Sequence, residues 1–152
     1  MRTTPAIDLD TAPQLWAVIG TLSRRLRPTS AHAAAGLTPT RSTVLQTVAR
    51  RGPLRLSELA SSEGINPTML SRITAHLADA GLLERVNDEG DRRAAWLKPT
   101  AAGRRVAERI WRERTDALGV ALAALREGDR RLIEQALPAL EQLAEQLKGR
   151  RA

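Results

Sequence analysis

The stretch from Leu56 to Leu77, LSELASSEGINPTMLSRITAHL, limits the possible folds of this chain more than any other. Its leucines and isoleucines recur at helical spacing on both sides of a glycine, which predicts two short helices joined by a tight turn. Gly64 can adopt a positive φ at no steric cost, and the small Ala60 lets the second helix cross the first closely. Asn66 followed by Pro67 indicates a helix start, because the amide side chain caps the helix and the proline presets φ. The pattern is typical of a helix-turn-helix.

The second of these helices has two contrasting faces. Leu70, Ile73 and Leu77 form an apolar face, which predicts burial against a core. The opposite face is small, polar and basic, and it therefore suits insertion into the major groove of duplex DNA. The candidate DNA-binding residues on this helix are Thr68, Met69, Ser71, Arg72, Ala75 and His76. A plain packing corner between two helices is the alternative, since it can show the same glycine and leucine spacing.

A β-hairpin is expected directly after the second helix. Residues 82–86 and 94–97 suit two short strands, and the segment 87–93, NDEGDRR, is typical of a turn. A hairpin in this place is the wing that a winged helix requires. An ordinary surface hairpin with self-paired charges is the alternative.

Two more helices are expected before this unit. The first follows a cap at Asp10 or Thr11, carries a broad apolar stripe, and ends at Pro28. Residues 28–36 then read as a connector, and the helix 39–51 is expected to bury Val44, Leu45 and Val48.

Two long helices are expected after the hairpin. Thr100 is predicted to cap the first, and Gly128-Asp129 to form the turn and cap of the second. Pro138 lies inside the last helix and should bend or break it locally. The leucines of these helices exceed what so small a DNA-binding unit can cover, which favours a dimerisation module built from both ends of the chain. A monomeric helical cap is the alternative.

Composition narrows the class of protein. The 152 residues suit one domain, and the lack of cysteine rules out disulfides and thiolate metal sites within the chain. The net charge of +7 favours nucleic acid, although an arginine-rich chain is also what a GC-rich genome encodes. No apolar run resembles a signal peptide or a membrane span, so a cytoplasmic protein without membrane association is expected.

An enzyme is not expected from these residues. The chain has two histidines, no glycine-rich phosphate loop and no metal-ligand spacing, so no catalytic residue, metal or cofactor is predicted. A winged-helix module that binds another protein instead of DNA is the remaining alternative. The groove face argues against it, because it lacks the large aromatic anchors of interface hot spots.

The layout resembles the MarR family of transcriptional regulators over nearly the whole chain. The matching segments are Leu37-Thr38-Pro39, GPLRLSELA from Gly52, LSRITAHLADAGLLERV from Leu70, DEGDRR from Asp88 and LKPTAAG from Leu97. The resemblance implies a mainly α fold with a small β-hairpin wing, in which a winged helix-turn-helix is joined to N- and C-terminal dimerisation helices. The corresponding ranges are 1–36 for the N-terminal arm and helix, 37–99 for the DNA-binding region, and 100–152 for the C-terminal helices.

The resemblance also implies roles for particular residues. In the wing, Asp91 would hold Arg93, which would enter the minor groove, with Arg92 beside them. A homodimer would place two recognition helices about 34 Å apart on a pseudo-palindromic operator in double-stranded DNA. A small phenolic or anionic effector would release a repressor by binding between the dimerisation and DNA-binding parts. The weak candidates for that pocket are Trp16, His32 and Trp111.

Overall fold

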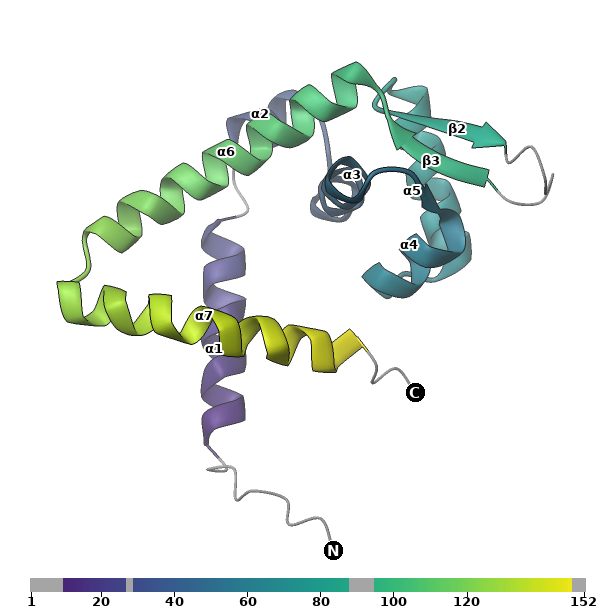
Figure 1. Cartoon of the computed structure of the whole chain (residues 1–152). Coiled ribbons are helices and arrows are strands. Elements are labelled where there is room, and N and C mark those ends of the chain that lie inside the picture. Colours follow the sequence, from purple (N-terminus) through teal and green to yellow (C-terminus); the bar gives the residue numbers. More distant parts are fainter. Residues whose placement is uncertain (1–9, 27–28, 88–94, 149–152) are drawn as a thin grey trace, which may run out of the picture.

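The computed structural model describes residues 10–26, 29–87 and 95–148 of the chain. Its elements are α1 (Thr11–Arg25), α2 (Ser30–Ala34), α3 (Pro39–Arg51), β1 (Leu54–Arg55), α4 (Leu56–Glu63), α5 (Pro67–Asp79), β2 (Leu83–Asn87), β3 (Ala95–Pro99), α6 (Ala101–Ala123) and α7 (Glu127–Lys148). The helices α3, α4 and α5 and the small sheet form a body, while α6 leads away from it to α7 (Figure 1). The predicted mainly α fold with a small β-hairpin wing is confirmed.

One apolar core lies inside the body. Each of α3, α4, α5 and β3 turns at least one leucine inward that is fully buried, and Ile110 closes the core from α6. The predicted inner face of α3 is confirmed, because Val44, Leu45 and Val48 have no exposed surface. This continuous burial makes the helix-turn-helix a rigid part of a larger unit, with its orientation fixed by packing on several sides.

The turn between α4 and α5 follows the sequence prediction closely. Gly64 ends α4 with φ of 66°, the left-handed conformation that glycine adopts without penalty. The Asn66 side-chain oxygen accepts a hydrogen bond from the backbone N–H of Thr68 at 2.8 Å, and Pro67 occupies the first helical position. Both local signals therefore place the start of α5.

Three antiparallel strands form the sheet, in the order β1-β3-β2. Val86 of β2 pairs with Trp96 of β3, and Arg55 of β1 pairs with the same tryptophan from the other side. The Arg55 guanidinium also lies 5.1 Å from the centre of the Trp96 ring, which fits a cation–π contact. The hairpin predicted from residues 82–97 is confirmed, and β1 adds a third strand to it.

A close joint connects the sheet and α5 to the long helix α6. The Thr100 hydroxyl donates to the carbonyl oxygen of Gly81 at 2.6 Å and accepts from the N–H of Gly103 at 2.9 Å. The N–H of Thr100 donates to the carbonyl oxygen of Leu82 at 3.1 Å. Gly103 packs directly on Leu82, and a Cβ there would lie 1.9 Å from the Leu82 oxygen. The predicted cap at Thr100 is thus also a tie between elements.

The connector predicted for residues 28–36 is wrong in one respect, because Ser30–Ala34 forms the helix α2. Thr29 caps it by accepting from the N–H of His32 at 3.0 Å. The Ser30 hydroxyl donates to the Glu113 carboxylate on α6 at 2.7 Å, and the N–H of Ala31 lies 3.3 Å from both carboxylate oxygens. A partner 83 positions away in the sequence therefore holds this short helix.

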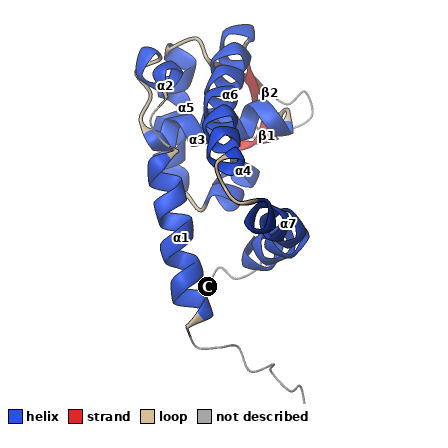
Figure 2. Ribbon diagram, turned by 90° about the vertical axis from the view of Figure 1, so that its left-hand side faces the viewer, coloured by secondary structure: helices blue, strands red, loops and turns tan. Residues whose placement is uncertain are grey.

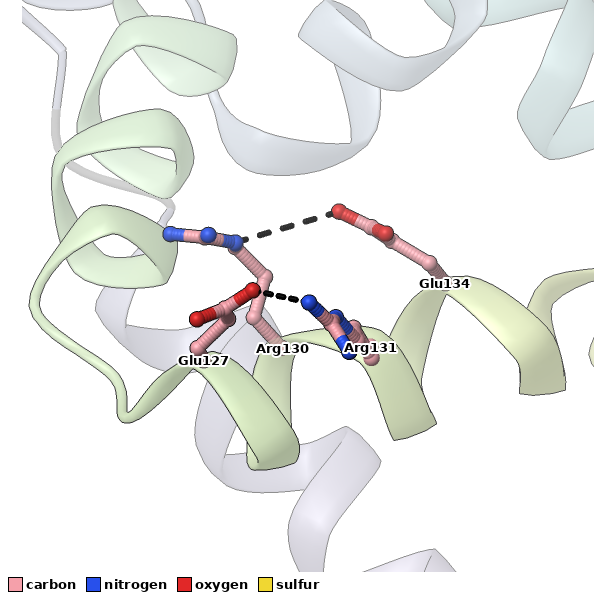
Figure 3. A network of polar contacts seen from close by, with 4 residues as sticks. All are labelled: Glu127, Arg130, Arg131 and Glu134. Atoms are coloured by element: carbon pink, nitrogen blue, oxygen red, sulfur yellow. Dashed lines mark hydrogen bonds and ion pairs between the residues drawn. The ribbon is translucent and has the colours of Figure 1, made fainter.

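The last helix differs from the prediction at its start, and it is not broken at its proline. It begins at Glu127, so Gly128 and Asp129 lie in its first turn instead of forming the preceding turn and cap. Pro138 lies inside the helix without breaking it. Pairs at i,i+4 spacing run along its first turns, from Arg131 to Glu127 and from Arg130 to Glu134 at 4.0 Å (Figure 3).

The helices α1 and α7 project away from the body. They overlap in the view of Figure 1, but the turned view of Figure 2 shows them well apart. None of the described residues of α1 is buried, and every α7 residue from 127 to 147 is at least partly exposed. No helix among residues 10–26, 29–87 and 95–148 combines the length and apolar character that a membrane crossing needs.

Candidate nucleic-acid interface

The outward face of α5 is the feature that best fits a nucleic acid. Leu70, Ile73, Thr74 and Leu77 are buried on the opposite side, so the rotation of the helix is fixed. The six candidates from the sequence lie on the remaining surface: Thr68, Met69, Arg72, Ala75 and His76 are exposed and Ser71 is half-buried. Polar donors, one guanidinium and a small alanine thus share one solvent-facing strip, which permits close approach to base edges.

The first turn of this face is held by the cap at Asn66 and by Pro67. Backbone N–H groups at the start of a helix carry partial positive charge, and anions bind there readily. Met69 is 56% exposed, although its neighbour Leu70 is fully buried. An exposed apolar side chain at this place fits contact with a thymine methyl group.

The structure describes the two paired strands at the base of the wing. Strands β2 and β3 pair from Leu83 with Pro99 to Asn87 with Ala95, and they extend beside α5 (Figure 1). The three wing candidates, Asp91, Arg92 and Arg93, lie outside the described residues. Their predicted roles stay predictions. The strand β3 continues through Pro99 directly to the cap of α6.

One residue of this surface was not singled out from the sequence. Arg41, in the first turn of α3, lines a groove of about 410 Å³ together with Thr68, Met69 and Arg72 of α5. It precedes the helix-turn-helix in the sequence and belongs to no motif of it. Its place follows only from the packing of α3 against α5, which no periodicity reveals.

The three ligand candidates do not share one site. Trp111 lines a groove of about 600 Å³ between α3 and α6, together with Gln46, Arg50, Arg104 and others. Trp16 is 77% exposed on α1 and does not line this groove. His32 also lies elsewhere, on α2, and its Nε2 atom is buried without a hydrogen-bond partner among the described residues.

Comparisons with known proteins decide the family. A model described as MarR family matches residues 37–95, from the residue before the cap of α3 to the start of β3. The HTH-type transcriptional regulator MT0903.1 of Mycobacterium tuberculosis (strain CDC 1551 / Oshkosh) is 27% identical over 129 residues, which are 85% of this chain and 89% of the relative. Residues 37–95 thus match the MarR family, and the rest of the chain is similar in extent to this relative.

Solved structures agree with this MarR fold. RV1404 from Mycobacterium tuberculosis has a TM-score of 0.79 at 20% identity and is matched over 91% of this chain and 95% of its own. The apo form of wild-type MarR from E. coli has a TM-score of 0.72 at 18% identity, with 86% and 96% covered. NadR in complex with 4-hydroxyphenylacetate has a TM-score of 0.67 at 25% identity, with 92% and 97% covered.

The family sets the general activity. The matched family and the names of the relatives indicate a transcriptional regulator of the helix-turn-helix type, a class of protein that is not an enzyme. This agrees with the position of the candidate DNA-binding residues on the outward face of α5.

The chain also carries an apolar surface that its own body does not cover. On α1 the exposed apolar residues are Trp16, Val18, Ile19 and Leu22. On α7 they are Leu132, Ile133, Leu137, Leu140, Leu143 and Leu147. Exposed stripes of this length are unusual on a monomer and are typical of a protein–protein contact.

Proposed function

We propose that this chain is a homodimeric repressor that binds a specific double-stranded DNA site and is released by a small anionic aromatic ligand. The outward face of α5 carries the proposal. Its inner side is locked into the core by Leu70 and Leu77, while Thr68, Arg72 and His76 face solvent. A helix with this division can enter a major groove without disturbing the fold.

In this proposal the recognition helix contacts the major groove and the wing contacts the minor groove. Thr68, Met69, Ser71, Ala75 and His76 contact base edges and Arg72 adds a cation in the major groove. Asp91 holds Arg93, and Arg93 with Arg92 contacts the minor groove and the backbone, where a narrow groove attracts arginine. The region 37–99 thus reads DNA, and the ranges 1–36 and 100–152 dimerise.

The exposed apolar residues support the dimer. Six apolar side chains of α7 are between 40% and 65% exposed in the single chain, and Trp16 on α1 is 77% exposed. A second copy is the partner that a self-complementary two-fold contact requires. Two recognition helices would then face half-sites about one DNA turn apart, roughly 34 Å.

The groove between α3 and α6 supports an effector site. It holds about 600 Å³, within the range of small-molecule pockets. Trp111 offers an aromatic wall, and Arg50 and Arg104 offer positive charge. The one carboxylate of the lining, Glu108, is paired with Arg112 at 2.6 Å, so an aromatic carboxylate still fits the chemistry of the groove. The similar NadR structure contains 4-hydroxyphenylacetate, a ligand of that class. A ligand here lies between the DNA-reading body and α6, where it can change the spacing of the two halves of a dimer.

A protection assay on the DNA upstream of the chain's own gene tests the proposal. The wild type is expected to protect two half-sites with centres one helical turn apart, about 10 base pairs. Ala75→Asp places a carboxylate on the exposed strip and should weaken this binding at least about tenfold, because it repels phosphate and blocks close approach.

Ala33→Asp is the matched control, since it makes the same change at an exposed position of α2. If the wild type binds no duplex, or Ala75→Asp binds as well as the control variant, DNA reading by α5 is refuted. Failure of all duplexes would instead favour the protein-interaction module.

The effector is tested by thermal unfolding with salicylate and with 4-hydroxyphenylacetate. A ligand at 100 times its dissociation constant stabilises the folded state by roughly 2.7 kcal/mol, which raises Tm measurably. Trp111→Ala should abolish the shift, whereas Trp16→Ala should retain it. No shift with either compound would contradict this effector class.

A further inference from the structure

The groove beside the recognition helix joins two arginines from different helices. It holds about 410 Å³ and is lined by Arg41 of α3 and by Asn66, Thr68, Met69, Arg72 and Ile73 of α5 and its cap. Arg41 and Arg72 therefore line the same space from two helices, although 31 positions separate them in the sequence. We call the group formed by Arg41, Arg72, Asn66 and Thr68 the phosphate seat.

The chemistry of the seat favours an anion. None of the described residues that line the groove is acidic. Within the part of the chain that the structure describes, neither guanidinium makes an ion pair or a side-chain hydrogen bond, so both remain available. The Asn66 oxygen is already used by the Thr68 N–H at 2.8 Å, which leaves its NH₂ group as a donor. A pocket of donors without acceptor partners fits a ligand that has several oxygens and a negative charge.

The position of the phosphate seat indicates which anion would bind there. Thr68, Met69 and Arg72 line the seat and also belong to the outward strip of α5. A helix of about 10–12 Å diameter nearly fills a major groove about 12 Å wide, so sugar-phosphate strands run along both of its sides. Arg41 lies on one of these sides, on α3, where a strand would pass.

We propose that the phosphate seat binds one backbone phosphate of the DNA strand that borders the recognised bases. This inference rests on the proposed function. It assigns Arg41, outside the helix-turn-helix, to the DNA interface and makes Arg72 a backbone contact. Sequence is then read by Thr68, Met69, Ser71, Ala75 and His76, because a phosphate contact positions the protein and carries no base information.

The half-buried state of Arg41 adds to its suitability. Its backbone is held in the first turn of α3, where its N–H donates to the Thr38 hydroxyl at 3.4 Å. A half-buried side chain has fewer orientations to lose on binding than one on a free surface. Arg41 thus offers the DNA strand a contact whose backbone is held in place relative to α5.

Salt dependence of binding tests the seat. Wild type, Arg41→Ala, Arg72→Ala and the double variant are titrated with the operator and with a scrambled duplex from 50 to 200 mM salt. The slope of log K against log salt is expected to flatten by about one for each protomer in either single variant. Binding to both duplexes should weaken together, so that the ratio between them stays within about twofold.

The double variant and two controls sharpen the result. Both arginines hold one phosphate, so the double variant should flatten the slope little beyond a single variant. Arg41→Lys keeps the charge and should keep most of the slope. Arg126→Ala, in the turn between α6 and α7, removes an equal charge at a distance from α5 and should bind as wild type (Figure 1).

A duplex with single uncharged methylphosphonates locates the phosphate. One neutralised position should weaken the wild type and leave Arg41→Ala unaffected. An unchanged slope in Arg41→Ala, or loss of the operator-to-scrambled ratio in Arg72→Ala, overturns the seat while the proposed function stands. If the wild type binds no duplex, both are overturned, and these two failures are therefore distinguishable.

Discussion

The DNA-reading body and the two arms α1 and α7 show the same helical periodicity with opposite results. On α5 the inward residues Leu70, Ile73 and Leu77 are 0–8% exposed. On α7 the corresponding stripe, which includes Leu137, is 40–65% exposed. The difference teaches that periodicity indicates which face needs a partner, while the same chain supplies that partner for α5 and leaves the α7 stripe exposed among the described residues.

The long helix α6 is buried against the body in its first half and exposed in its second half. Its first half packs on the body through Gly103, Ala107 and Ile110, which are buried. Beyond Ile110, Trp111 and Val120 are 51% and 73% exposed. In the proposed function, a ligand in the groove between α3 and α6 would therefore act on α7 through this helix.

The largest expected effect distinguishes a buried face of the body from its exposed face. Leu45→Ala removes a fully buried side chain from α3 and should lower the free energy of unfolding by roughly 2–5 kcal/mol, since it leaves a cavity. Met69→Ala, at a position 56% exposed on α5, should change it by no more than about 0.5 kcal/mol. Chemical denaturation measures both. Equal losses would show that burial of the inward face does not set the stability of the body.

The next effect concerns the contact between the body and α6. In Gly103→Ala the new Cβ meets the Leu82 carbonyl oxygen at 1.9 Å, so backbone must shift and stability should fall by roughly 1–3 kcal/mol. Gly119→Ala is the matched control on α6, because nothing lies within 4 Å of its Cβ. That control should gain up to about 1 kcal/mol from helix propensity. Thermal unfolding distinguishes these opposite signs, and a neutral Gly103→Ala would contradict the tight joint.

Much of the body could be predicted from the sequence because its signals are local. The turn follows from the local conformational preferences of Gly64, Asn66 and Pro67. The burial of Leu70 and Leu77 follows from their helical spacing. The hairpin was predicted from two extended runs around a turn-like segment. The outward position of Thr68 and Arg72 follows once the inner face is known.

The missed features depend on long-range contacts. The helix α2 is stabilised by Glu113, which lies 83 positions from Ser30, and no short pattern predicts that contact. Arg41 lines the groove beside α5 only through the packing of α3 on α5. Gly103 gave one usable signal, since a glycine inside a helix costs about 1 kcal/mol and often has a packing reason.

The apolar stripe of α7 is tested by measuring the oligomeric state of variants. Leu137 is 51% exposed, so burying the rest of its side chain in a dimer would stabilise the contact by roughly 1 kcal/mol for each protomer. Leu137→Ala should therefore raise the dissociation constant of a two-fold dimer by roughly 30-fold, with the stability of the body unchanged. Gln142→Ala, on the opposite face of α7 at 100° per residue, should leave it unchanged. Sedimentation at several concentrations measures both, and identical behaviour of the two variants would exclude the leucine stripe as the contact.

The smallest expected effect concerns the tie between α2 and α6. The hydrogen bond from the Ser30 hydroxyl holds the pKa of Glu113 below its ordinary value of 4.5; burial opposes this shift, and the backbone N–H of Ala31 adds to it. A carboxylate with a lowered pKa in the folded state stabilises that state above its unfolded pKa, and this contribution disappears as pH falls through the folded pKa. Glu113→Gln should therefore be less stable than wild type at neutral pH, and the two should converge below about pH 4.5. Asp116→Asn makes the same charge change on an exposed carboxylate of α6 and serves as the control in denaturation curves from pH 7 to pH 3. A constant difference between wild type and Glu113→Gln across that range would show that the carboxylate charge does not hold α2, and that the hydroxyl and amide contacts are equally served by a neutral oxygen.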